Sequence, residues 1–289
     1  MRSNHAKGKP SHSRRHALAD TYRRGLYETI FRRRDIRHFR PDPVPDEVLA
    51  RMLVAAHHAA SVGFTQPWDF IIVRDLDRRS KVQTIFAEER ARNAGQFIGA
   101  RRQKFLSLKL EGILEAPLNL IITCEPDRDG LAILGKTSIR EVEIYSACLA
   151  VGNLWLAARA EGVGVGWVSI LRNEDIRQIF AIPEHVIPIA YLCVGYTDDF
   201  PAQPLLQSAE WASRIPPRSL IHFESWAQRD DLAAADGRPS LAELVQGPAI
   251  WRDLFPDWHL DSSTAEANGS AAASPQHDSH SLGAVPSKP

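Results

Sequence analysis

The sequence predicts an α+β fold in which a sheet is wrapped by helices. Helical segments outnumber strand segments, and the two do not alternate regularly as they do in a doubly wound parallel sheet. The glycines of "EGVGVG" at 161–166 also lack the GxGxxG spacing of a dinucleotide-binding turn. With 289 residues, the chain is long enough to bury a large core without disulfide or metal crosslinks.

The elements of the first half follow from apolar spacing and prolines. Apolar residues repeat at helical spacing over 22–31, and "RPDPVP" at 40–45 then excludes a helix. Asp46 is expected to cap the next helix. "DFIIVRD" at 69–75 predicts a buried strand, residues 78–115 a polar helical region, and "PLNLIITC" at 117–124 a second strand.

The second half contains the longest predicted helix, at 141–162. Its apolar residues cover nearly all sides, which predicts a central and buried helix that Gly162 ends. "VGVGWVSI" at 163–170 predicts a third strand. Asn173 is expected to cap a short helix, and "VIPIAYLCVGY" at 186–196 predicts a fourth strand.

Composition divides the chain into a body and flanking segments. Residues 1–20 and 262–289 are polar or biased toward Ser, Ala, Gly and Pro, so we expect disordered tails there. Residues 21–226 form the expected main domain, and 227–261 an extension. The aromatic segment 250–260 is expected to pack on the body or on a second subunit.

Charge and cysteine usage exclude several classes of protein. Lysine plus arginine and aspartate plus glutamate each number 35, so no basic excess indicates a nucleic-acid partner. The three cysteines form no CxxC pair, which is typical of a reducing compartment. No apolar run reaches bilayer length, and no secretory signal opens the chain. We therefore expect a cytoplasmic protein with no membrane partner and no metal site.

The most informative short segment is "RRRDIRHF" at 32–39. Arg33, Arg34 and Arg37 offer the guanidinium groups that bind phosphate through paired hydrogen bonds. Asp35 lies among them either as an ion-pair partner or as a group that performs chemistry beside a phosphorylated ligand. The alternative is a solvated basic helix end.

Two further segments carry polar or small residues at the ends of predicted elements. Ser61 and Gln66 lie in a helix-to-strand loop and offer hydrogen bonds to a polar ring, although an ordinary loop has the same composition. The alternating glycines of 162–166 remove side chains from one face of a strand and make room for a planar ring. Ser169 follows them. It does not lie in a GxSxG motif, so we do not expect it to be a hydrolase nucleophile.

Taken in order, these segments resemble the nitroreductase-like FMN enzymes, and more closely their BluB branch, the 5,6-dimethylbenzimidazole synthases. The resemblance extends from Leu26 to Trp226 and includes "RRxxR", "SVGFxQPWxF", "SLKLEGI", "NLWLAARAEGVGVGWVSI" and "WASRIP". It implies an α+β homodimer with a mostly antiparallel central sheet and FMN at the subunit interface. Residues 21–226 would be the FMN-dependent catalytic domain.

The resemblance also implies a reaction. Members of this branch fragment reduced FMN with molecular oxygen into 5,6-dimethylbenzimidazole, the lower ligand of vitamin B12, and erythrose 4-phosphate. Their important aspartate and serine correspond to Asp35 and Ser169. Asp35 would move protons near C1′ of the ribityl chain, and Ser169 would hold a proton near the ring. A separate flavin reductase is the expected source of reduced FMN.

The remaining residue assignments follow from the same resemblance. Arg33, Arg34 and Arg37 would hold the phosphate and ribityl end. The other expected contacts to FMN are Ile36, Ser61, Gln66, Leu106, Lys109, Gly166, Trp167 and Arg214.

The chain departs from the family pattern at a few positions. Ala60 and Thr65 replace a usual proline and methionine, and Arg140 and Glu141 replace a frequent Pro-Gln pair in an expected lid at 135–143. Two other functions stay open: an NAD(P)H-dependent flavin reductase of nitro compounds or quinones, and a non-catalytic flavin carrier. Relatives of the first kind commonly have serine where Asp35 stands, and a carrier needs neither Asp35 nor Ser169.

Overall fold

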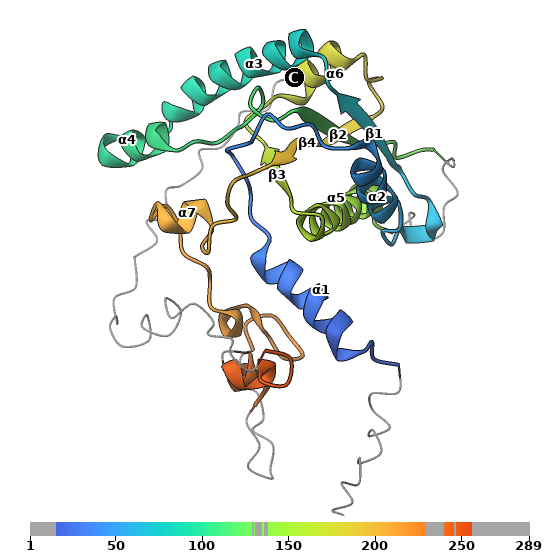
Figure 1. The fold of residues 1–289 in the computed structure, drawn as a ribbon, viewed down its shortest axis with the longest axis vertical. Coiled ribbons are helices and arrows are strands. Elements are labelled where there is room, and N and C mark those ends of the chain that lie inside the picture. Colours follow the sequence, from blue (N-terminus) through green and yellow to red (C-terminus); the bar gives the residue numbers. More distant parts are fainter. Residues whose placement is uncertain are drawn as a thin grey trace, which may run out of the picture. The chain divides into compact units, whose positions relative to one another are not determined.

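The structure is a computed structural model that describes residues 16–128, 130, 135, 138–228, 240–245 and 247–255 (Figure 1). The chain divides into two compact units, Met1–Arg214 and Ile215–Pro289. Residues 1–15 and 262–289 of the expected disordered tails, part of the aromatic segment 250–260 and part of the expected lid at 135–143 lie outside the described residues, while Asp20 of the first tail already begins a helix. Those expectations and the boundary at residue 226 stay predictions.

The first unit is built on a four-stranded sheet. Its strands are β1 (Trp68–Val73), β2 (Leu118–Cys124), β3 (Val163–Val168) and β4 (Ile187–Tyr196), in the order β1-β2-β4-β3. All three pairings are antiparallel. The α+β class and the antiparallel sheet expected from the sequence are confirmed.

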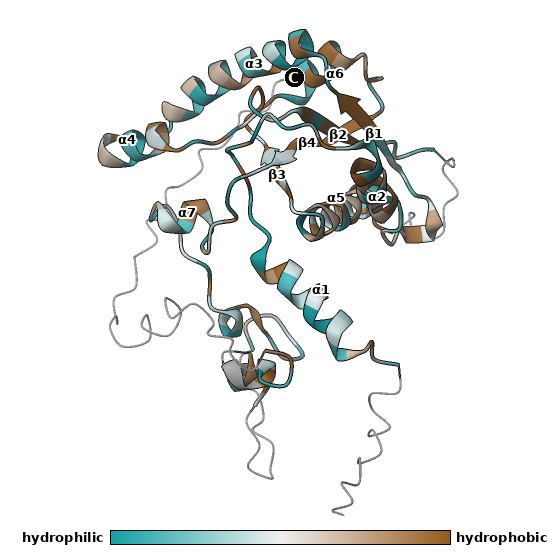
Figure 2. Cartoon of the chain, in the orientation of Figure 1, coloured by the Kyte–Doolittle hydropathy of each residue, from teal (hydrophilic) through white to brown (hydrophobic). Residues whose placement is uncertain are grey.

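Helices cover both faces of this sheet (Figure 1). On one face, α2 (Asp46–His57) and α5 (Val142–Ala160) pack against the strands through a core that includes Met52, Leu120 and Leu154. On the other face, α3 (Leu76–Ala94) and α6 (Asn173–Phe180) enclose a second core around Phe86 and Ile121. Figure 2 shows that β1 and β4 are predominantly hydrophobic, and β4 lies between the two cores.

The other elements are short or lie at the margins. The first unit also contains α1 (Asp20–Arg32), the 3₁₀ turn η2 (Val62–Phe64), α4 (Gly99–Ser107) and α7 (Leu205–Ser208). The second unit contains η3 (Pro217–Leu220), α8 (Leu241–Leu244) and η4 (Pro248–Trp251), with a capping box between Ser240 and Glu243 at the start of α8. Within the described residues, no helix is both long enough and apolar enough to cross a bilayer.

Three expectations about these elements are wrong. The strand expected to be buried at 69–75 is β1 at the sheet edge, where only the end residues Trp68 and Val73 are buried. The helical region expected at 78–115 is present as α3 and α4, which are separated between Gly95 and Gly99, and Gly99 has φ +51°. Asp46 and Asn173 are the first residues of their helices and follow the caps Pro45 and Arg172. Helix α5 is not buried all round, since Tyr145 and Leu149 are more than half exposed.

Candidate active site

The arginine–aspartate segment leaves α1 and continues along the free edge of β3. Arg33 already has an extended backbone, and the Ile36 N–H donates to the Val165 carbonyl at 3.0 Å. Asp35 and Val165 form a parallel bridge, and the Arg40 N–H donates to Tyr196 at 2.8 Å. The main chain of β3 and β4 therefore fixes the position of Asp35.

The alternating glycines of β3 accommodate this segment. A Cβ atom on Gly166 would collide with the Ile36 carbonyl oxygen, and one on Gly164 would lie 3.1 Å from the Ile36 side chain. The absence of side chains at Gly164 and Gly166 thus allows Ile36 to pack against β3. Our interpretation that these glycines leave room for a planar ring is wrong on this face. Ile36 is itself buried, at 4% exposure.

Asp35 is held by two donors yet remains accessible. Its Oδ1 accepts the Trp167 N–H at 2.9 Å, and its Oδ2 accepts from Nη2 of Arg37. The side chain is 44% exposed. Burial raises the pKa of the Asp35 carboxyl, although Arg37, the Trp167 N–H and Arg33 all favour the ionised form. A carboxyl with a raised pKa and an open face is suited to proton transfer.

Arg37 links Asp35 to β3 through Nη2, and its second terminal nitrogen, Nη1, makes no hydrogen bond to the described residues. Its Nη2 also donates to the Trp167 carbonyl at 2.8 Å, and only 10% of its side chain is exposed. Nη1 of Arg37 is buried and has no hydrogen-bond partner among the described residues. Buried donors are nearly always paired, so this nitrogen is a candidate contact for a bound ligand.

The neighbouring Arg33 and Arg34 differ sharply in their contacts. Burial lowers the pKa of the Arg33 guanidinium, Asp35 opposes this, and the charge of Arg214 lowers it further. Arg33 and Arg214 are thus two cations close together, an arrangement that an anion would stabilise. Arg34 instead donates to the carbonyls of Phe31 at 2.7 Å and Arg33 at 2.8 Å, and to that of Ala202. Its guanidinium ties the end of α1 to a distant loop.

Trp155 in α5 belongs to this cluster, although no sequence pattern had selected it as a site residue. Arg33 lies over its ring at 4.7 Å, and its indole N–H donates to the Arg34 carbonyl at 3.2 Å. Its ring is also 6.4 Å from that of Trp167. The apolar pattern of α5 classified Trp155 as a core residue.

Three other residues expected near the flavin are Ser169, Lys109 and Leu106. Ser169 is exposed just beyond the end of β3, two residues after Trp167. Lys109 forms an ion pair with Glu115, which also lies 4.0 Å from His38, so this loop borders the arginine–aspartate segment. Leu106 is 46% exposed on α4, and no described contact joins it to the cluster.

Ser61 and Gln66 are brought together by the loop before β1. The Ser61 hydroxyl accepts the Gln66 N–H at 3.2 Å, and Nε2 of Gln66 donates to the Phe64 carbonyl at 3.1 Å. Three residues of the loop have left-handed backbones: Gly63 (φ 61°), Phe64 (φ 59°) and Gln66 (φ 46°). Such a conformation strains residues other than glycine, and the hydrogen bonds maintain it.

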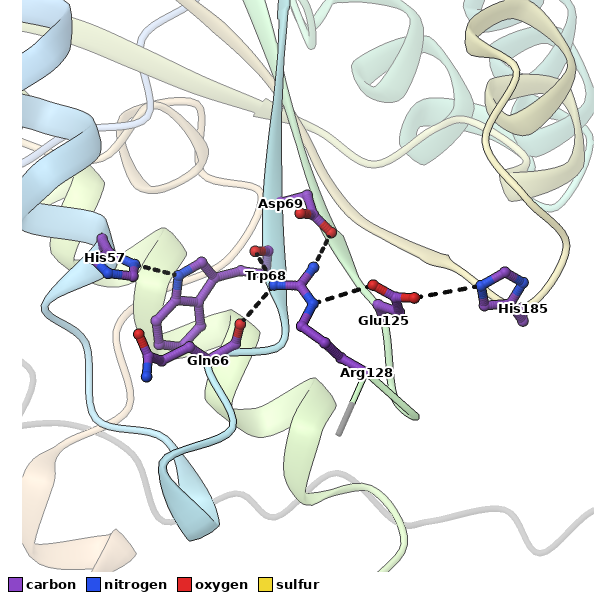
Figure 3. Close-up of polar contacts among 7 residues, drawn as sticks. All are labelled: His57, Gln66, Trp68, Asp69, Glu125, Arg128 and His185. Atoms are coloured by element: carbon purple, nitrogen blue, oxygen red, sulfur yellow. Dashed lines mark hydrogen bonds and ion pairs between the residues drawn. The ribbon is translucent and has the colours of Figure 1, made fainter. Parts of the chain in front are cut away.

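A cleft of about 350 Å³ opens beside this loop, lined by His57, Phe64, Thr65, Gln66, Trp68 and Arg128. Figure 3 shows Arg128 between Asp69 and Glu125, where it also donates to the carbonyls of Gln66 and Trp68. The indole N–H of Trp68 donates to Nδ1 of His57 at 3.3 Å. Arg128 therefore anchors the end of the loop. No sequence pattern had singled it out.

The two groups of predicted residues lie at opposite edges of the sheet. Gln66 precedes β1, and the arginine–aspartate segment borders β3, with β2 and β4 between them. Trp68 pairs through Cys124 with Ile187, whereas Val168 pairs with Tyr191, four residues further along β4. At about 4.8 Å between strands and about 3.3 Å per residue, Trp68 and Val168 are roughly 20 Å apart. One isoalloxazine ring does not span that distance.

Comparisons with known proteins agree on one family. Residues 30–196 match the Nitroreductase family. The 5,6-dimethylbenzimidazole synthase of Rhodospirillum rubrum is 39% identical over 196 residues, which cover 68% of this chain and 93% of that protein.

Solved structures show the same fold. An iodotyrosine deiodinase bound to FMN and 3-iodo-L-tyrosine aligns with a TM-score of 0.52 at 23% identity, covering 61% of this chain and 91% of that one. A BluB-like flavoprotein from Clostridium difficile 630 gives 0.52 at 20% identity, covering 69% and 99%. With a matching family profile over more than half its length and a relative covered almost completely, this chain belongs to the nitroreductase family.

Proposed function

We propose that the chain is a 5,6-dimethylbenzimidazole synthase, which fragments reduced FMN with molecular oxygen into 5,6-dimethylbenzimidazole and erythrose 4-phosphate. The 39% identity to the Rhodospirillum rubrum enzyme, over nearly all of that enzyme, supports this choice within the family. The product would serve as the lower ligand of cobalamin. The proposal includes a cytoplasmic location and a separate flavin reductase that supplies reduced FMN.

The environment of Asp35 is the observation that carries the proposal. Its carboxyl is open on one face, its pKa is raised by burial, and Arg37 and the Trp167 N–H fix its direction. A carboxyl with a raised pKa, an open face and a fixed direction is a candidate for proton transfer.

The surrounding residues fit a phosphorylated flavin. Arg33 and Arg214 supply two neighbouring cations for a phosphate, and Nη1 of Arg37 is a buried donor without a protein partner among the described residues. Arg34 is less suited to this role, because carbonyl groups of the chain already accept from its guanidinium.

The mechanism assigns the chain's own residues to binding and proton transfer. Bound FMN would supply the reactivity toward oxygen. Asp35 would remove and return a proton at C1′ of the ribityl chain, where general acid–base catalysis typically contributes about 10²–10⁴-fold. Ser169, at the same edge of the sheet, would hold a proton near the ring. Trp167, whose main chain is bonded to both Asp35 and Arg37, would lie along the ring.

Ser61 and Gln66 would reach the same flavin from a second copy of the chain. The separation of roughly 20 Å between Trp68 and Val168, at the two edges of the sheet, supports a shared site, because a single protomer does not bring both groups to one ring. Leu106 and Lys109 complete the proposed contacts. A symmetric homodimer would contain two such sites, each made of one arginine–aspartate segment and one Ser61–Gln66 loop.

Two other functions are distinguished by their products. An NAD(P)H-dependent nitroreductase would leave FMN intact, and so would a flavin carrier. Asp35 favours the synthase, because neither reduction by hydride transfer nor storage requires a proton-transferring carboxyl at that position.

Purified protein mixed with chemically reduced FMN in air tests the proposal. Chromatography should detect 5,6-dimethylbenzimidazole; reoxidised FMN as the sole product would contradict the synthase. A parallel reaction with NADPH and a nitroaromatic compound should show slow turnover or none. Rapid turnover there, with no dimethylbenzimidazole in the first reaction, would identify a nitroreductase.

A further inference from the structure

Trp155 touches both residues that precede Asp35. The Arg33 guanidinium stacks on its ring at 4.7 Å, and its indole N–H donates to the Arg34 carbonyl at 3.2 Å. The two contacts use different parts of one side chain, the ring face and the ring edge. They join α5 to the end of α1 across more than 120 positions of sequence.

The direction of the Arg33 side chain depends on the Trp155 ring beneath it. Arg33 and its neighbour Arg214 repel one another, and that repulsion would separate two free side chains. A guanidinium on an indole face is held by the negative charge of the ring surface. The ring therefore offsets part of the repulsion and keeps Arg33 beside Asp35, whose charge also acts on it.

We propose that Trp155 is a positioning residue for the phosphate end of the flavin site: its ring holds Arg33 toward the phosphate, and its N–H fixes the peptide that leads into Asp35. This inference rests on the proposed function and deepens it. Trp155 itself would not contact the reacting atoms. Its effect would appear as discrimination between FMN and riboflavin, which differ only by the phosphate.

A packing role alone makes a different prediction. Trp155 is partly buried against the core between the sheet and α5, and its ring lies near that of Trp167. If it only filled space, its loss would lower the free energy of unfolding and weaken both flavins by the same factor. The ratio of the two affinities separates these roles.

The first experiment titrates FMN and riboflavin into the purified full chain and follows flavin fluorescence. For Trp155→Leu we expect the FMN affinity to fall about tenfold, the loss of one favourable cation–π contact, while the riboflavin affinity changes less than about twofold. Trp155→Phe keeps an aromatic face and should retain most of the preference for FMN. If the leucine variant does not fold, Trp155→Phe still tests whether an aromatic face maintains the preference for FMN.

Phe200→Leu is the matched control. The Arg159 guanidinium lies 4.1 Å from the centre of the Phe200 ring. Arg159 belongs to the same helix as Trp155. Its replacement removes a comparable cation–π contact without removing the ring beneath Arg33, so the ratio of FMN to riboflavin affinity should stay at the wild-type value. An equal fall in that ratio for Phe200→Leu and Trp155→Leu would overturn the inference.

A double-mutant cycle with Arg33→Gln completes the test. If Trp155 acts through Arg33, Trp155→Leu should change the affinity ratio by less than about twofold once Arg33 is glutamine. Additive effects would overturn the proposal, and so would a wild-type protein that binds FMN and riboflavin equally well. These measurements need no product formation. If the synthase assay fails while the mutant cycle is non-additive, only the proposed function is refuted. If the synthase is active while the cycle is additive, only the role of Trp155 is refuted.

Discussion

The segment around Asp35 and the loop from Ser61 to Gln66 are fixed by different means. The first is joined to β3 by an isolated main-chain bridge and to β4 by a further main-chain hydrogen bond from Arg40. The second is held mainly by side-chain hydrogen bonds, both its own and those of Ser146 and Arg128, and has three left-handed residues in a row of four. Main-chain bonds to a sheet resist displacement, whereas exposed loops open more easily. The comparison indicates that the proton-transferring half of the proposed site is preorganised and that the loop half completes it.

The largest expected effect is on the preorganised half. Asp35→Asn should retain flavin binding and lower the rate of 5,6-dimethylbenzimidazole formation by about 10²–10⁴-fold, because the proton-transferring group is lost. Ser169→Gly should reduce the same rate by a smaller factor. Single-turnover assays with reduced FMN in air measure both rates. Full activity in both variants would remove the assigned roles.

Mixed dimers test whether the two halves belong to different subunits. Gln66→Val places a β-branched residue at φ 46°, which should disorder the loop and inactivate the protein. A 1:1 statistical mixture with Asp35→Asn would contain heterodimers with one intact site each. In a two-fold dimer we expect the mixture to regain roughly one quarter of wild-type activity. If both halves acted within one chain, mixing would restore nothing.

The glycines of β3 provide a graded test of the packing between β3 and the arginine–aspartate segment. Gly166→Ala drives a Cβ into the Ile36 carbonyl and should cost about 1–3 kcal/mol of unfolding free energy, together with activity. Gly164→Ala meets the Ile36 side chain at 3.1 Å and the Gly195 carbonyl oxygen at 3.2 Å, which are looser contacts, and should cost less. Gly152→Ala, with open space around its Cβ on α5, should be neutral or stabilising. Urea denaturation measures all three, and equal values would contradict the packing.

The smallest expected effect is the pH dependence of stability at Asp35. Its pKa in the folded protein is raised above the value of 3.8 for the free side chain, so the folded state disfavours the carboxylate. The resulting destabilisation is absent below the unfolded pKa and fully present once pH exceeds the folded pKa. Asp35→Asn should therefore melt at a higher temperature than the wild type at neutral pH. The difference should vanish as the pH falls toward 4.

Asp42→Asn is the control for that measurement. Asp42 accepts from Arg40 at 2.9 Å at the surface, and its replacement should give no such gain at neutral pH. Melting curves between pH 4 and 8 compare the two variants. A wild-type protein that melts above Asp35→Asn throughout that range would contradict a raised pKa.

The sequence predicted the four strands and the long helix because their apolar and β-branched residues follow the spacing of each element, although it overestimated the burial of β1 and α5. It did not predict that the strand at 69–75 lies at an edge, since pairing order is a tertiary property that an apolar run does not encode. It identified Arg33, Arg34 and Arg37 as one group, although Arg34 turns back to carbonyl groups at the helix end. Adjacent identical residues leave a helix terminus in different directions, and only the fold fixes those directions.

The contribution of Trp155 was beyond the sequence for a similar reason. An aromatic residue at an apolar helical position is most often a core residue, and its contacts to Arg33 and Arg34 arise from the packing of α5 beside α1. The glycines of β3 were interpreted as room for a planar ring, which is wrong on this face because Ile36 of the same chain lies against them. Composition does not reveal such a partner.

The bridge between Asp35 and Val165 involves only main-chain atoms, and the carboxylate adds its own bonds to the Trp167 N–H and to Arg37. A substitution at residue 35 changes the chemistry and these two side-chain bonds, while the main-chain bridge stays. Selection can then exchange a proton donor for a neutral hydroxyl, or the reverse, in one step and without repacking a core. Such a position gives one fold a route to diverge into several reactions.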